Sequence, residues 1–257
     1  RKIMAIAIYS NVLDNGGISK FVYNMHHAFQ KKNIKSEIVT FSADTIYGDN
    51  ITLLSCTNHG NRIMKLRRFI LDKDIDSIIA NTWFEGLIAK LAAVFSGKKV
   101  KVISVVHIRP NLWGFSKNDI LRSSVAKISL NLCDKVIAVS NELKEALIKE
   151  GWVNKKKITT IYNPVIFYEI KYHKIKYKDI KGKKNINIAV IGWIQPRKAQ
   201  DIIIKAFSEV KDRNFTLNFI GGVENKDFND EVLTLIKEKD IIGDICKWAQ
   251  CKEDIYE

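Results

Sequence analysis

The sequence predicts an α/β protein made of two successive doubly wound units, each a parallel sheet packed between helices. Short runs rich in Val and Ile alternate with amphipathic segments of helical length, which is the pattern of a parallel sheet buried on both faces. The alternation stops at residues 165–184 and then restarts. The second stretch has room for only two or three strands, whereas such sheets usually carry about five or six. We therefore expect the second unit to be incomplete in this chain.

In the first unit, residues 1–164, near-continuous apolar runs predict strands at 3–10, 34–42, 51–56, 75–83, 100–107, 134–140 and 157–164. Apolar residues at helical spacing predict helices between them, at 18–32, 61–73, 86–96, 117–131 and 141–151. The last of these helices has Asn141 as its expected N-cap and Gly151 at its C-terminal end.

Residues 165–184, VIFYEIKYHKIKYKDIKGKK, are rich in Lys and Tyr and predict a solvated linker. The second unit, residues 185–257, opens with the apolar strand INIAVIGWI. Its other expected elements are a helix at 199–212, a strand at 215–222, a helix at 229–240, a short strand in ICKWAQ and the start of a helix in EDIYE.

The composition excludes a disordered or membrane-spanning class. Hydrophobic residues make up 46% of the chain and charged residues 27%, as in folded soluble proteins. The most apolar stretch, LIAKLAAVFSGKK, is interrupted by Lys90 and Lys98, so no run approaches the roughly 20 residues that cross a bilayer. The four cysteines lack metal-ligand spacing. We therefore expect a cytoplasmic protein with reduced thiols.

The net charge of +14 resides in the first part of the chain. Residues 1–184 hold 32 Lys and Arg against 15 Asp and Glu, whereas residues 185–257 hold 10 against 13. This asymmetry predicts an anionic partner for the first part, such as a membrane surface or nucleic acid. In the helix expected at 61–73, basic residues are interleaved with apolar ones; a solvated face is one interpretation, and contact with anionic lipid is the other. The basic residues are Arg62, Lys65, Arg67 and Arg68.

Two basic residues fall where the helix at 199–212 is expected to begin. In IGWIQPRKAQDII, residues 191–203, Arg197 and Lys198 follow a buried strand and a glycine, Gly192. A helix N-terminus already carries about half a positive charge, and its first turn usually prefers acidic residues. The pair therefore predicts a bound anion such as a phosphate. Side chains that simply point into water are the alternative.

Three segments, in this order, resemble the retaining glycosyltransferases of family 4, which have the GT-B fold. DNGGISKFVYNMHHAFQKKN (14–33) is similar to the family's first glycine-containing loop and helix. CDKVIAVSNELKEALIKEGWVNKKKITTIYNPV (133–165) is similar to the stretch in which a strand ending in AVS leads through a helix to KI…IYNGV. AVIGWIQPRKAQDIIIKAFSEV (189–210) is similar to the opening of the nucleotide-sugar domain. The resemblance extends over nearly the whole chain.

The resemblance implies two Rossmann-like domains facing a cleft, the first binding the acceptor and the second the nucleotide-sugar donor. It implies transfer with retention of anomeric configuration and usually without a metal, so no cofactor is expected. The strand at 100–107 ends in a histidine that matches a family residue near the transferred sugar. The implied site residues are His107 for sugar positioning, and Gly16, Gly17, Gly192, Arg197 and Lys198 for the donor.

The chain departs from the family pattern G-R-L-x-x-x-K-G at two positions. Trp193 stands in place of the Arg, and Ala199 in place of the last Gly. Losing a guanidinium weakens a phosphate clamp; Arg197 is the candidate to replace it, and Trp193 is expected either to stack on the base or sugar or to pack. The family's E-x7-E element is expected beyond Glu257, so we interpret the chain as C-terminally truncated, with an incomplete donor site and no activity on its own.

The expected function is therefore transfer of a hexosyl or N-acetylhexosaminyl group to a glycan or lipid-linked glycan, in bacterial envelope or capsular polysaccharide synthesis, at the inner face of the plasma membrane. A nucleotide-sugar epimerase of the same fold would need acid/base carboxylates in the cleft, and none can be placed. A basic binding module would need aromatics interleaved with basic residues on one face, which only KYHKIKYK offers, so we expect no nucleic-acid partner.

DKDID (72–76) contains Asp-x-Asp, but before a strand rather than after one. We therefore expect no metal site.

Overall fold

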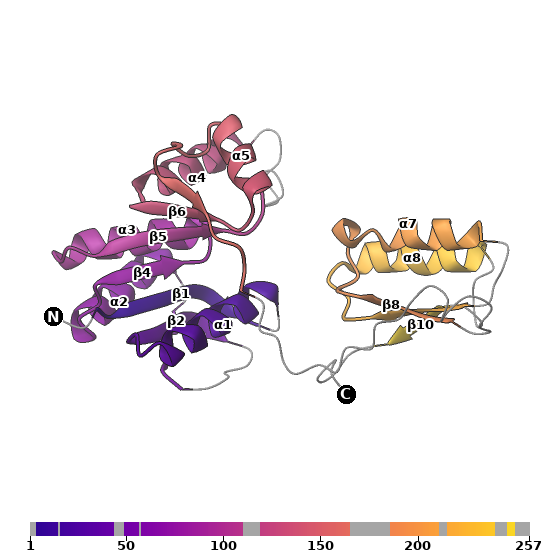
Figure 1. Ribbon diagram of the computed structural model, residues 1–257, viewed down its shortest axis with the longest axis horizontal. Helices are drawn as coiled ribbons and strands as arrows, with labels where there is room; N and C mark the ends of the chain where they lie inside the picture. Colours follow the sequence, from indigo (N-terminus) through magenta and orange to yellow (C-terminus); the bar gives the residue numbers. More distant parts are fainter. Residues whose placement is uncertain are drawn as a thin grey trace. The chain divides into compact units, whose positions relative to one another are not determined.

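The computed structural model describes residues 4–14, 16–43, 49–56, 58–109, 119–164, 186–210, 215–239 and 246–249. The chain forms two compact units, Arg1–Tyr168 and Glu169–Glu257. The division falls within residues 165–184, the predicted linker, which lies outside the described residues. Each unit contains a parallel sheet with helices packed against it (Figure 1). Among the described helices, none has the length and hydropathy needed to span a bilayer.

The first unit contains a seven-stranded parallel sheet in the order β3-β2-β1-β4-β5-β6-β7. The order reverses direction between β1 and β4, which makes this pair the topological switch point of a doubly wound sheet. All seven predicted strands are present, and most of them are shorter than the apolar runs that predict them. They are β1 (Ile6–Leu13), β2 (Ser36–Ala43), β3 (Ile51–Leu53), β4 (Ser77–Ala80), β5 (Lys101–Val106), β6 (Lys135–Ala138) and β7 (Ile158–Thr160).

The five described helices of this unit cover both faces of the sheet. Alternate residues of β1 face opposite cores: Ile6 and Ile8 pack on the α1 side, and Ala7 and Tyr9 pack on the α2 and α3 side. The α4 and α5 helices pack against β6 on the side opposite α1. The helices are α1 (Gly17–Lys31), α2 (His59–Asp72), α3 (Trp83–Ser96), α4 (Ile120–Leu132) and α5 (Asn141–Lys149).

Side-chain caps fix where these helices begin. The Thr82 hydroxyl accepts from the backbone N–H of Glu85 at 3.2 Å, which starts α3 earlier than the predicted residue 86 and shortens the preceding strand. Our N-cap assignment for α5 was wrong by one residue: the Ser140 hydroxyl accepts from Leu143 N at 3.1 Å, and Ser140 is the cap. Gly151 follows α5 with a φ of 68°, the left-handed conformation that commonly ends a helix.

The second unit contains a three-stranded parallel sheet in the order β10-β9-β8. Two helices pack on the same side of it (Figure 1), and their apolar residues form one core with Leu217 and Phe219. On β8, intermediate and exposed residues alternate, and Ile191 is 60% exposed. The elements are β8 (Ile186–Ile191), η2 (a 3-10 turn, Pro196–Lys198), α7 (Gln200–Ser208), β9 (Phe215–Ile220), α8 (Lys226–Glu238) and β10 (Cys246–Ala249).

The start of α7 differs from the prediction. Ala199 has φ 54° and ψ 36°, a left-handed conformation that separates the 3-10 turn from α7. Arg197 and Lys198 therefore lie in a 3-10 turn directly before α7, which begins at Gln200, one residue after the predicted start. The α8 helix begins three residues earlier than predicted because the Asn225 side chain accepts from Phe228 N at 2.8 Å.

Candidate functional site

Polar segments follow three neighbouring strands of the first unit. The Asp14–Gly17 segment follows β1, Asn81 and Thr82 follow β4, and His107 follows β5. Because the strands are parallel and adjacent, these segments lie at the same edge of the sheet, next to the switch point. Ligands of doubly wound sheets bind outside the carboxyl ends of the strands at that point. This edge is the candidate site of the first unit.

The glycine loop is organised by Asp14. Its Oδ1 accepts from Gly16 N at 2.7 Å and from the Ser19 hydroxyl at 2.8 Å, while Asp14 N donates to that hydroxyl at 3.0 Å. A Cβ added to Gly16 would lie 2.7 Å from Asp14 Oδ1, so a larger residue there would displace the Asp14 side chain that organises the turn. A Cβ on Gly17 would meet no atom within 4 Å. Packing therefore does not demand glycine at position 17, which leaves close approach of a ligand as a reason for it.

His107 is held at the end of β5 by α1. Its ring makes an edge contact with Phe21, at 4.9 Å between centroids and 78° between planes. Burial lowers the pKa of His107 to about 4, so the imidazole is neutral at pH 7. Its Nε2 is buried and has no hydrogen-bond partner among the described residues. A neutral ring fits the predicted role in positioning a sugar. It offers no positive charge for binding a phosphate.

A buried acid at the switch point was missed by the sequence analysis. Glu85, in the first turn of α3, is 4% exposed, and its Oε1 accepts from Asn11 N at 2.6 Å. Burial raises the pKa of Glu85 to about 7, although the hydrogen bond from Asn11 opposes the rise. One signal was available: Glu85 lies three and four residues before Ile88 and Ala89, which places a charge on the apolar stripe of the helix.

Arg62 lies beside Asn11, the residue that Glu85 contacts, and does not belong to an exposed basic face. Its guanidinium lies 5.6 Å from the centroid of the Phe41 ring, and Nη1 is 3.5 Å from Asn11 Oδ1. Its Nε is buried without a hydrogen-bond partner among the described residues. We had grouped Arg62 with three other basic residues as a membrane contact; its inward orientation removes it from that group.

The other three basic residues of α2 border the surface. The Lys65 ammonium contacts the carbonyls of Leu54 and Ser55, and Arg67 Nε donates to Phe95 O at 2.9 Å. Arg68 is exposed and pairs with Asp72 at 3.5 Å. A shallow hollow of about 530 Å³ is lined by Asn61, Met64, Lys65, Arg67 and Arg68.

In the second unit, Gly192 and Lys198 lie together at the end of β8. A Cβ added to Gly192 would lie 3.5 Å from Lys198 Cε, so the lysine side chain covers the glycine. Arg197, also exposed, is directed elsewhere because its Nε donates to Gln195 Oε1 at 2.7 Å. A Cβ on Gly221, at the end of β9, would lie 2.4 Å from Gly192 O. The two strand ends therefore approach each other through glycines, with the Lys198 ammonium above them.

Trp193 packs on the turn that follows β9. A Cβ on Gly222 would lie 2.9 Å from the indole ring, and the buried Gln200 donates through Nε2 to Trp193 O at 2.9 Å. The residue nevertheless stays 45% exposed. Packing, one of the two roles predicted for Trp193, is thus observed, and an exposed part of the residue remains for a ligand.

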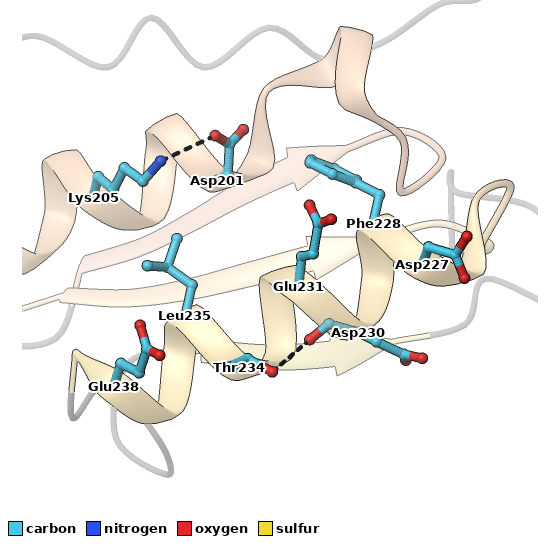
Figure 2. A pocket seen from close by; sticks show the side chains of 9 residues that line it. All are labelled: Asp201, Lys205, Asp227, Phe228, Asp230, Glu231, Thr234, Leu235 and Glu238. Atoms are coloured by element: carbon cyan, nitrogen blue, oxygen red, sulfur yellow. Dashed lines mark hydrogen bonds and ion pairs between the residues drawn. The ribbon is translucent and has the colours of Figure 1, made fainter.

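A separate hollow of about 600 Å³ lies between α7 and α8 (Figure 2). It is strongly acidic, and its one lysine, Lys205, pairs with Asp201 at 3.4 Å. An anionic donor would be repelled here, so this hollow is not the phosphate site. Its lining consists of Asp201, Lys205, Asp227, Phe228, Asp230, Glu231, Thr234, Leu235 and Glu238.

The aspartates of DKDID are engaged locally. Asp72 pairs with Arg68, Asp74 pairs with Lys98, and Asp76 Oδ2 accepts from Ala5 N at 3.0 Å. They lie between α2 and β4, at the amino end of the strand. In the described part of the chain, no three His, Cys, Asp or Glu side chains are grouped as metal ligands.

A doubly wound sheet with a glycine loop and a histidine at its carboxyl edge, followed by a second unit with a lysine above a glycine, is the arrangement that the resemblance to GT-B glycosyltransferases implies. The sequence model of Glycosyltransferase Family 4 matches residues 15–166, more than half of the chain. The chain belongs to this family and is a glycosyltransferase. No curated protein matches the chain.

Solved structures share its fold. HepE from Anabaena, in complex with UDP-glucose, aligns with a TM-score of 0.75 at 17% identity, over 98% of this chain and 70% of that one. The apo lipopolysaccharide outer core galactosyltransferase WaaB gives 0.66 at 18%, over 97% and 69%. A glycosyltransferase from Rickettsia africae gives 0.70 at 14%, over 99% and 70%. These similarities show the GT-B fold, and this chain spans about 70% of the length of each.

Proposed function

We propose that this glycosyltransferase uses a nucleotide diphosphate-sugar and that the donor diphosphate binds above Gly192. The observation that carries the proposal is the Lys198 side chain, which lies over this glycine at the carboxyl end of β8. A missing Cβ lets a phosphate approach the backbone, and an ammonium offsets its charge. The HepE structure with UDP-glucose adds support from a protein of the same fold.

Two further parts of the chain serve the donor in this proposal. The exposed part of Trp193 stacks on the base or sugar, which compensates for the arginine absent from its position. In the first unit, Gly17 offers open space at the start of α1, and the neutral His107 orients the transferred sugar by hydrogen bonding. These roles come from the family resemblance and from the local environments described above.

Transfer with retention breaks the bond between the anomeric carbon and the diphosphate oxygen and forms a bond from the acceptor oxygen on the same face. Negative charge develops on the departing diphosphate, where a fixed cation contributes most. Lys198 supplies that cation, and the acceptor proton leaves toward the released diphosphate. The proposal includes no metal; transfer that survives EDTA is its expected outcome, and activity restored only by Mn²⁺ or Mg²⁺ would overturn this part.

The acceptor is proposed to be a lipid-linked or envelope glycan reached at an anionic membrane surface. On α2 and α3, Met64 is 53% and Phe95 57% exposed, next to Lys65, Arg67 and Arg68. Exposed apolar residues beside cations are the composition of an interfacial membrane contact. Each cation near anionic lipid contributes about 1 kcal/mol.

The donor site is tested with Lys198→Ala, using Lys205→Ala as the matched control because Lys205 is also an exposed lysine of the second unit. We expect Lys198→Ala to weaken binding of UDP or GDP by roughly ten- to a hundredfold, since a charge-assisted contact contributes about 1.5–3 kcal/mol. Lys205→Ala should leave the affinity unchanged. Equal affinities of both variants and the parent protein in calorimetry would overturn the assignment.

The membrane face is tested by sedimentation with vesicles. Binding to anionic vesicles should fall with salt, because the Debye length shrinks from about 10 Å at 0.1 M to about 3 Å at 1 M. Replacing Lys65, Arg67 and Arg68 with Gln should weaken it. Replacing the exposed Lys149, Lys155 and Lys156 with Gln removes the same charge elsewhere and should not. Equal losses in the two triple variants would show a diffuse charge effect and no defined face.

A further inference from the structure

The end of β1 extends beyond its neighbour β4. Pairing of β1 with β4 stops at Tyr9 and Ala80, whereas pairing with β2 continues to Leu13. On the open side of this extension, Asn11 N donates to Glu85 Oε1 at 2.6 Å. A side-chain carboxyl thus occupies the place where the carbonyl of a longer β4 would continue the ladder.

A second set of contacts surrounds this bond. The Tyr9 hydroxyl donates to Asn11 Oδ1, and Arg62 Nη1 lies 3.5 Å from the same oxygen. Asn81 Nδ2 donates to Tyr9 O at 3.0 Å. Residues of α2 and α3 and the residue after β4 therefore converge on Tyr9 and Asn11, near the end of β1.

The cluster is not arranged for greatest stability. Glu85 Oε2, Arg62 Nε and Asn81 Oδ1 are each buried without a hydrogen-bond partner among the described residues. A buried polar atom left unpaired costs about 1–3 kcal/mol, and apolar side chains would fill this space without that penalty. Local rules broken inside a well-packed core mark functional positions more often than defects.

The anchored strand leads directly to the glycine loop. Leu13 is fully buried and Asp14, the next residue, makes the turn that holds Gly16 and Ser19 at the start of α1. Only two residues, Val12 and Leu13, separate Asn11 from this turn. A shift at Asn11 is therefore passed on to the loop.

We propose that Glu85 is a positioning residue that fixes the end of β1 and, through it, the Asp14–Gly17 loop. Its part in sugar transfer rests on the proposed function, in which this loop contacts the donor. Glu85 touches no substrate in this role, because its carboxyl is enclosed.

The anchor responds to pH. Burial raises the pKa of Glu85 to about 7. Of the titratable groups nearby, Tyr9 on β1 interacts with Glu85, and Tyr9 in turn interacts with Arg62 and Cys56. In the closed form, in which Asn11 is bonded to Glu85, the buried carboxyl binds its proton more tightly than in an open form, in which this bond is broken and the carboxyl is solvated. Closure is favoured below pH 7, and the open fraction grows about tenfold between pH 6 and pH 8.

Amide hydrogen exchange of the 257-residue chain tests this directly. The variants are Glu85→Gln, which keeps an oxygen acceptor without the titration, and Glu85→Ala, which removes the acceptor. The matched control is Glu145→Gln, an exposed glutamate of α5. Protection of Asn11 and Val12, corrected for intrinsic exchange, should fall about tenfold from pH 6 to pH 8 in the parent and the control. The pH effect should vanish in Glu85→Gln, and Glu85→Ala should lose at least about tenfold in protection at every pH.

Several outcomes would overturn the proposal: no pH effect in the parent protein, an effect that persists in Glu85→Gln, or full protection of Asn11 in Glu85→Ala. Protection along β5 reports global folding; if Glu85→Ala is unfolded, Glu85→Gln alone decides. Calorimetry with UDP and GDP separates the two claims. Weaker binding in Glu85→Ala supports the loop's role, whereas a parent protein that binds neither nucleotide defeats the proposed function while the exchange data still judge the anchor.

Discussion

The two units of this chain use the same kind of strand in different surroundings. IAIYSNVL forms β1, of which the first five residues are buried, while the equally apolar INIAVI forms β8, in which intermediate and exposed residues alternate. The first sheet has helices on both faces, whereas the described helices of the second lie on one side (Figure 1). An apolar run therefore predicts a strand, and the helices around the sheet decide how much of it is buried.

The largest test of this comparison is one substitution made in both units. Ile78 on β4 is fully buried, and Ile191 on β8 is 60% exposed. We expect Ile78→Ala to lower the free energy of unfolding of the first unit by about 2–5 kcal/mol. Ile191→Ala should change that of the second unit by less than about 0.5 kcal/mol.

Guanidinium unfolding resolves the two effects if the fluorescence of Trp83 and Trp152 reports the first unit and that of Trp193 the second. Ile194→Ala is the control, because Ile194 is 2% exposed and belongs to the core of the second unit; it should destabilise that unit alone. A cost for Ile191→Ala equal to that for Ile78→Ala would mean that the open face of β8 is covered.

The second prediction concerns Glu85, the buried acid of the first unit; the described residues of the second unit include no buried acid. Burial raises the pKa of Glu85 from its ordinary value of 4.5 to about 7 in the folded protein. The folded state therefore binds more protons between these values, and stability falls as pH rises from 4.5 to 7. Glu85→Gln removes this loss, so the variant should gain on the parent protein by up to about 3 kcal/mol between pH 5 and pH 8.

The measurement is the difference in unfolding free energy of the first unit at pH 5 and pH 8. Glu145→Gln should show no such gain, and the second unit, observed through Trp193, should show none in either variant. If the parent protein instead gained stability relative to Glu85→Gln as the pH rises from 5 to 8, the sign would be opposite to the one expected. That result would refute the raised pKa of Glu85.

The positions of the strands and helices were predictable because Val/Ile runs and helical periodicity are local signals that the packed sheet reinforces. Two site residues were predictable in principle. Arg62 precedes Leu66 by four residues and Glu85 precedes Ala89 by four, so both fall on buried stripes of their helices. A charge on such a stripe indicates an internal partner. The partner itself, Asn11, was hidden because it lies 51 and 74 residues away in sequence.

Other features have no signal in the sequence. Ala199 is left-handed although alanine favours a continuous helix. Arg197 and Lys198, in the turn before it, direct their side chains to different partners. The inward direction of Arg62 likewise depends on Phe41, whose ring lies under its guanidinium.

The third prediction compares a glycine at a strand end, Gly221, with a glycine at a helix start, Gly17. Gly221 has a φ of 149°, and a Cβ there would lie 2.4 Å from Gly192 O, whereas a Cβ on Gly17 would meet nothing within 4 Å. Gly221→Ala should destabilise the second unit by about 2–3 kcal/mol, through backbone strain and overpacking. Gly17→Ala should leave the first unit as stable as before and weaken only nucleotide binding. A stability loss in Gly17→Ala comparable to that in Gly221→Ala would show that both glycines serve packing.

The smallest expected effect comes from reciprocal changes at two left-handed residues. The first unit places Gly97, with φ 71°, at the end of α3, whereas the second unit places Ala199, with φ 54°, before α7. A Cβ in this conformation costs about 1–2 kcal/mol, partly offset because glycine gains more freedom on unfolding. Ala199→Gly should therefore stabilise the second unit by about 0.5–1 kcal/mol. Gly97→Ala should destabilise the first unit by a similar amount, because a Cβ on Gly97 meets no atom within 4 Å and only the backbone conformation matters.

Unfolding followed separately in each unit measures both changes. Opposite signs of similar size support a left-handed Ala199, and destabilisation by Ala199→Gly would instead show that α7 continues unbroken through that residue.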